Sequence, residues 1–119
     1  MLLHIDEVVC GLGRTGKWFG YQNYDVQPDI VTVAKGLAAG YAAISVTVTS
    51  DKVFEMFKED PSNPVRYFRD ISTFGGCTAG PAAALETLNI IKRDKLLENV
   101  NTVGEYLNCL LYTSPSPRD

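Results

Sequence analysis

Two side chains able to react or to bind charged groups follow strand-like runs of this sequence. Asp6 comes near the end of the apolar run 2–9, and Lys35 directly follows the apolar run 30–34. The carboxyl ends of strands in open α/β sheets form the edge at which ligands bind. A carboxylate and an amine withdrawn from water there need a compensating partner. The spacing leaves two interpretations open: the groups pair with each other or reach water, or they face one cavity and bind a cofactor.

Pyridoxal phosphate is the cofactor that such a pair would suit. A lysine amine can bind its aldehyde covalently, and an acidic side chain can hold its pyridine nitrogen in the protonated form. On the second interpretation, Lys35 and Asp6 would therefore contact opposite ends of one small aromatic aldehyde.

The glycine-rich segment 11–17 resembles two phosphate-binding motifs, and neither fits. Gly11-x-Gly13-x-x-Gly16 has the dinucleotide-binding spacing, but residues 17–21 (Lys-Trp-Phe-Gly-Tyr) are a poor start for the helix that this motif needs. The segment also matches most of a P-loop, but Trp18 stands where a Ser or Thr must bind Mg²⁺. We expect the glycines to allow a tight loop with positive φ, with Arg14 holding it in place.

The remaining pattern predicts an α/β fold with strands first and helices later. Strands are expected at 2–9, 30–34 and 44–49, and the intervening segment 37–43 is too short for a crossover helix. The last two strands are therefore predicted to be antiparallel neighbours or to be separated in the sheet. Helices are expected after Ser50 as N-cap, after Pro81 in a first turn, and over 95–111.

Three segments in order resemble the motifs of class III pyridoxal-phosphate-dependent aminotransferases. They are residues 6–17, residues 28–36 with their Ala-Lys-Gly, and residues 72–76. The resemblance implies part of the large domain of a fold-type I transferase, with a mostly parallel sheet flanked by helices. Residues 1–111 would form this partial cofactor-binding domain, and residues 112–119 would be an unrelated Ser/Pro tail.

The resemblance also implies roles for single residues. Lys35 would be the catalytic lysine that binds the cofactor covalently and moves the proton. Asp6 would contact the pyridinium nitrogen, and Val8 would pack against the ring. Thr73 would contact the cofactor phosphate of a neighbouring subunit, so a homodimer is expected. Glu7 and Arg14 would belong to the scaffold.

By the same resemblance, the reaction would move an amino group from an ω-amino compound to a 2-oxo acid such as pyruvate. Residues 4–11, 18–22 and 67–77 favour taurine as the donor. Two alternatives stay open: an aminomutase of the same fold, and a catalytically inactive structural fragment.

The composition excludes several other classes. The 119 residues include 11 Lys and Arg against 14 Asp and Glu, so no basic surface for nucleic acid or membrane is expected. No apolar run reaches the roughly 20 residues of a membrane span, and no secretion signal is visible. Three scattered cysteines and the single His4 predict neither a disulfide framework nor a metal site. We expect a cytoplasmic protein with reduced thiols.

Overall fold

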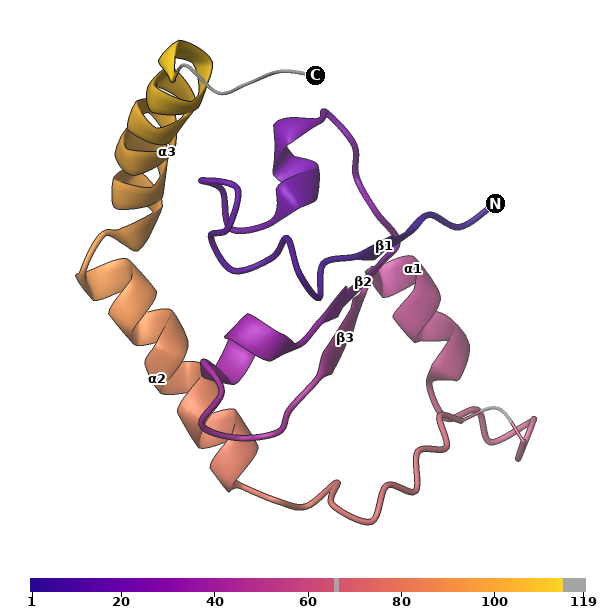
Figure 1. Ribbon diagram of the computed structural model, residues 1–119. Coiled ribbons are helices and arrows are strands. Elements are labelled where there is room, and N and C mark those ends of the chain that lie inside the picture. Colours follow the sequence, from indigo (N-terminus) through magenta and orange to yellow (C-terminus); the bar gives the residue numbers. More distant parts are fainter. Residues whose placement is uncertain (66, 115–119) are drawn as a thin grey trace, which may run out of the picture.

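The computed structural model describes residues 1–65 and 67–114, so Arg66 and residues 115–119 of the predicted tail lie outside the description. Figure 1 shows the arrangement of the elements. In chain order they are β1 (His4–Asp6), η1 (Gly20–Asn23), β2 (Ile30–Val33), η2 (Lys35–Ala38), β3 (Val46–Thr49), α1 (Asp51–Phe54), η3 (Glu55–Phe57), α2 (Ala79–Arg93) and α3 (Leu96–Thr113), where η denotes a 3-10 helix.

The described strands form one three-stranded sheet of order β1-β2-β3. β1 runs parallel to β2 with Asp6 opposite Thr32, and β2 runs antiparallel to β3 with Val33 opposite Val46. The antiparallel neighbours expected from the short connection are thereby confirmed. The sheet is mixed within this chain, and helices accompany it, as the predicted α/β class requires.

The core lies on one face of β2. Val31 and Val33 are buried and contact Leu37 of η2 and Ala84 of α2. Alternate residues of a strand point to opposite faces, so Thr32 lies on the other face with its neighbour Asp6. The small cluster packs η2 and α2 against the sheet just beyond the end of β2, and this fixes the start of η2 at Lys35.

One helix signal differs from expectation and another agrees with it. Ser50 occupies the N-cap position of α1, but its hydroxyl makes no capping bond and has no partner among the described residues. The helix predicted over 95–111 is confirmed and continues through Thr113. Lys95 separates α2 from α3, because its left-handed backbone (φ 51°) cannot continue a helix.

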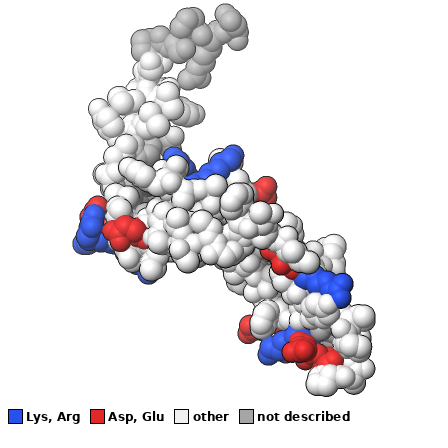
Figure 2. Space-filling view, turned by 90° about the horizontal axis from the view of Figure 1, so that it is seen from below, with Lys and Arg blue, Asp and Glu red and all other residues white. Residues whose placement is uncertain are grey.

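The chain is extended and leaves much apolar surface open. Its radius of gyration is 18.9 Å, whereas a compact chain of this length has about 13.5 Å. The segment between η3 and α2 runs away from the sheet (Figure 1). The central surface seen in Figure 2 carries few charges. Large exposed apolar side chains on α3 and on that segment include Val103, Leu107, Leu110, Ile71 and Phe74.

Candidate functional site

The structure places Asp6 and Lys35 at the same edge of the sheet. Asp6 is the last residue of β1, and Lys35 begins η2 shortly after β2 ends at Val33. β1 and β2 are parallel, so their carboxyl ends meet at one edge, as the sequence predicts. Both side chains are exposed. An amine and a carboxylate therefore follow adjacent strands at the edge where α/β folds bind ligands.

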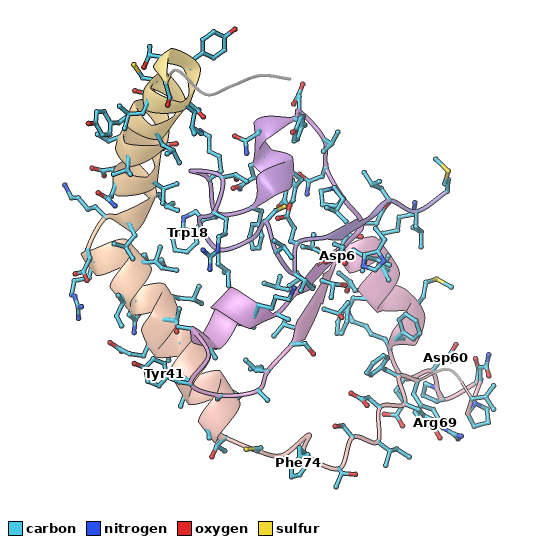
Figure 3. The ribbon with its side chains drawn as sticks, viewed as in Figure 1. Asp6, Trp18, Tyr41, Asp60, Arg69 and Phe74 are labelled. Atoms are coloured by element: carbon cyan, nitrogen blue, oxygen red, sulfur yellow. The ribbon has the colours of Figure 1, made fainter. Side chains whose placement is uncertain are left out.

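The carboxylate of Asp6 is held by the chain that follows it. Its Oδ1 accepts a hydrogen bond from the backbone N–H of Val8 at 2.9 Å. His4 lies two residues earlier on the same face of β1, and its Nε2 is 2.7 Å from Oγ1 of Thr32. Asp6 and His4 thus belong to a polar row on the face of the sheet opposite the Val31–Val33 core. Asp6 is labelled in Figure 3.

Lys35 has a backbone conformation that is unusual for its residue type. Its φ of 47° lies in the left-handed region, where a side chain other than that of glycine is strained. Lys35 also lines a cleft of about 550 Å³ together with Leu12, Gly36 and Leu97. A strained residue that is held beside a cleft by the packing of η2 is typical of functional positions.

Asp6 and Lys35 line different clefts in this chain. Asp6 borders a second depression of about 450 Å³, with Glu7, Tyr21 and Tyr24 among its other lining residues. The sequence predicts one shared cavity for the two groups, but neither of these clefts contains both of them. The loop 10–15 contributes residues to both clefts and so lies between them.

The other two predicted cofactor residues lie apart from each other. Val8 is half-buried beside Asp6, to which its backbone N–H is bonded. Thr73 is exposed in a turn of the segment between η3 and α2, where the N–H of Gly75 donates to the carbonyl oxygen of Ser72 at 3.1 Å. Phe74, the next residue, lies far from Asp6 in Figure 3. The contact of Thr73 with a neighbouring subunit's cofactor stays a prediction.

Glu7 is a second carboxylate at this edge, and it is buried. Only 2% of its surface is exposed, and its two carboxylate oxygens accept the backbone N–H groups of Gly20 and Tyr21 at 2.9 and 2.7 Å. The scaffold role expected from the sequence agrees with these contacts. The sequence signal for this role is a carboxylate within an apolar run that ends in glycine. The pattern does not show which groups the carboxylate binds, because Gly20 and Tyr21 lie 13 and 14 residues further along the chain.

The glycines of the loop after β1 make room for α3. Gly13 has a φ of 96°, and a Cβ there would lie 2.8 Å from Cδ2 of Leu97. Gly16 has a φ of 80°, and a Cβ there would lie 1.8 Å from Oδ1 of Asn101. The first helix after the loop is the four-residue η1, whose N-terminus is too short to hold a pyrophosphate. The rejection of both phosphate-binding motifs is therefore supported.

The described residues show neither a metal-binding cluster nor a membrane-spanning helix. Cys10, Cys77 and Cys109 are free thiols, and no three His, Cys, Asp or Glu side chains gather there in a way that would hold a metal ion. Within residues 1–65 and 67–114, no helix combines the length and the apolar character needed to cross a bilayer.

The fold and the sheet edge define part of the large domain of a pyridoxal-phosphate-dependent transaminase. An aminotransferase structure from Bacillus anthracis superimposes with a TM-score of 0.83 at 46% identity, covering 89% of this chain and 23% of that one. A taurine:2-oxoglutarate aminotransferase from Bifidobacterium kashiwanohense, solved with pyridoxal phosphate and glutamate, gives 0.83 at 32% identity, covering 95% and 24%.

The chain belongs to the class III aminotransferase family, because residues 1–116 match the family described as "Aminotransferase class-III". A similar curated relative is a taurine–pyruvate aminotransferase from Rhodobacter capsulatus. The two are 71% identical over 107 residues, which are 90% of this chain and 23% of the relative. The chain thus spans about a quarter of the length of the relatives that it matches.

Proposed function

We propose that the complete protein containing this chain is an aminotransferase that converts taurine and pyruvate into sulfoacetaldehyde and alanine. One observation carries the proposal. The amine of Lys35 and the carboxylate of Asp6 follow adjacent parallel strands, in a chain 71% identical to a taurine–pyruvate aminotransferase. Residues 1–111 would be part of the cofactor-binding domain, and residues 112–119 would lie outside it.

The Lys35 amine and the Asp6 carboxylate at the sheet edge are groups of the kind that bind pyridoxal phosphate. When bound, this cofactor supplies an electron sink that stabilises negative charge on the substrate carbon next to the amino group. Lys35 would hold the aldehyde end covalently and would move the proton between the two carbon positions. Asp6 would accept a hydrogen bond from the protonated pyridine nitrogen, which its negative charge favours. The bond that the Val8 N–H donates to Asp6 Oδ1 orients this carboxylate.

Two further contacts complete the proposed site. Val8 would pack against one face of the ring, since it is half-buried and adjoins Asp6. Thr73 would bind the phosphate of the cofactor in a neighbouring subunit. The exposed position of the turn that contains it, away from the sheet, leaves it free to do so. The active protein would then be a homodimer.

Reductive labelling tests the cofactor assignment. The complete protein is incubated with pyridoxal phosphate, reduced with sodium borohydride and digested, and the labelled peptide is identified by mass spectrometry. We expect the phosphopyridoxyl group on Lys35, and no label at that peptide in Lys35→Ala. A label of undiminished amount in Lys35→Ala would remove the catalytic role of this lysine.

A substrate panel tests the reaction. Taurine with pyruvate should yield alanine, and omission of pyruvate should stop turnover. Alanine formation with other ω-amino donors but not with taurine would overturn the choice of donor. Use of 2-oxoglutarate in place of pyruvate would overturn the choice of acceptor. Isomerisation of a single substrate without any acceptor would indicate the aminomutase instead.

A further inference from the structure

Glu7 is the residue through which β1, β2 and the glycine loop are joined. Its backbone N–H donates to the carbonyl oxygen of Thr32 at 2.9 Å, and its own carbonyl oxygen accepts the N–H of Gly11 at 2.9 Å. Its carboxylate accepts the N–H groups of Gly20 and Tyr21. The backbone N–H, the backbone carbonyl oxygen and both carboxylate oxygens of this buried residue are therefore all hydrogen-bonded to backbone groups.

Two glycines pack closely against Glu7. A Cβ on Gly20 would lie 3.2 and 3.3 Å from its two oxygens and 3.0 Å from Cβ of Cys10. A Cβ on Gly11 would lie 2.7 Å from the carbonyl oxygen of Glu7. A buried carboxylate is costly unless its oxygens are bonded, and charge-assisted bonds to backbone N–H groups are among the stronger ones. The backbone around Glu7 is thus shaped to hold this side chain in one position.

Besides its pairing with β2, the end of β1 is held by the hydrogen bonds of Glu7. The strand is only three residues long, and Asp6 is its last residue. The chain beyond Asp6 is held by the bonds of Glu7 on one side and by the Val8 N–H bond to Asp6 on the other.

We propose that Glu7 is a positioning residue that sets the direction of the Asp6 carboxylate. Glu7 would act through the backbone and would not touch the cofactor, while Asp6 would touch it. The inference rests on the proposed function, since it concerns how Asp6 meets a pyridine nitrogen. Loss of the two bonds to residues 20 and 21 would let the end of β1 shift, and small misplacements at reacting groups are known to have large effects.

The test compares Glu7→Gln with a matched control in the complete protein. Glutamine keeps the shape of glutamate, but its NH₂ group would face a backbone N–H donor. We expect the dissociation constant for pyridoxal phosphate to rise about tenfold, together with a change in the absorption spectrum of the bound cofactor. The control, Asn101→Ala, loosens the same loop at Gly16 without touching Glu7. It should lower the melting temperature and leave affinity and spectrum unchanged.

A milder variant covers the case in which Glu7→Gln does not fold. Gly20→Ala forces the Glu7 carboxylate to shift by a few tenths of an ångström. It should change affinity and spectrum in the same direction as Glu7→Gln. Unchanged affinity and spectrum in Gly20→Ala, or an equal effect of Asn101→Ala, would overturn the inference.

The inference and the proposed function fail in different ways. Asp6→Asn is measured beside the other variants. If the wild-type protein binds no pyridoxal phosphate, the proposed function fails and the role of Glu7 falls with it. If the wild type binds it and Asp6→Asn weakens binding, but the Glu7 and Gly20 variants behave as wild type, only the positioning role is wrong.

Discussion

Asn101 donates a hydrogen bond from Nδ2 to the carbonyl oxygen of Gly16 at 3.2 Å, although 85 residues separate the two. Leu97, one turn earlier on α3, lies against Gly13 of the same loop. This loop follows directly on β1 and its last residue, Asp6. Helix α3 therefore packs on a loop whose glycines leave no space for larger residues.

Substitution of Gly16 by alanine should destabilise the protein strongly. The new Cβ would lie 1.8 Å from Oδ1 of Asn101, and the φ of 80° would add backbone strain. We expect the free energy of unfolding of the complete protein, measured in urea, to fall by about 3 kcal/mol. Gly40→Ala is the matched control, because Gly40 has a φ of 83° and nothing within 4 Å of the added carbon. It should cost only about 1 kcal/mol.

A double variant separates crowding from strain. Gly16→Ala combined with Asn101→Ala should recover part of the lost stability, because the clashing side chain is gone. Equal losses in Gly16→Ala and Gly40→Ala, or no recovery in the double variant, would contradict the close packing of α3 on the loop.

The left-handed backbone of Lys35 predicts a conflict between stability and function. Glycine adopts a φ of 47° without strain, whereas alanine does not. Without cofactor, we expect the free energy of unfolding of Lys35→Gly to be about 1 kcal/mol higher than that of Lys35→Ala. Neither variant should be labelled at position 35. Equal stability of the two variants would contradict the presence of backbone strain at Lys35.

The apolar surface of the chain predicts its behaviour in isolation. With a radius of gyration of 18.9 Å and exposed residues such as Ile71 and Leu111, the 119-residue chain should bind a hydrophobic dye and self-associate. Sedimentation velocity and thermal melting monitored by circular dichroism measure both properties. A monomer that melts cooperatively would contradict this expectation and would show that the chain folds alone.

The elements and the candidate edge could be predicted because local signals specify them. β-branched runs and glycine breaks place β2 and β3, and the seven-residue connection limits how they can pair. Asp6 and Lys35 are brought to one edge because their strands run parallel. The residue types of the loop after β1 were sufficient to reject a phosphate-binding helix there.

Long-range contacts could not be predicted from the pattern. The partners of Glu7 lie 13 and 14 residues away, and Gly16 meets Asn101 only because α3 folds back onto the loop. β1 is shorter than the apolar run 2–9, since the chain turns at Glu7, whose carbonyl oxygen bonds the N–H of Gly11.

In the proposed site, Asp6 and Lys35 hold opposite ends of one pyridine ring. A crystal structure of the complete protein grown with pyridoxal phosphate measures this directly. We predict a covalent bond from Nζ of Lys35 to the cofactor and a carboxylate oxygen of Asp6 within about 3 Å of the ring nitrogen. A cofactor bound away from this edge, or a ring nitrogen facing a residue other than Asp6, would show that the proposed site is wrong.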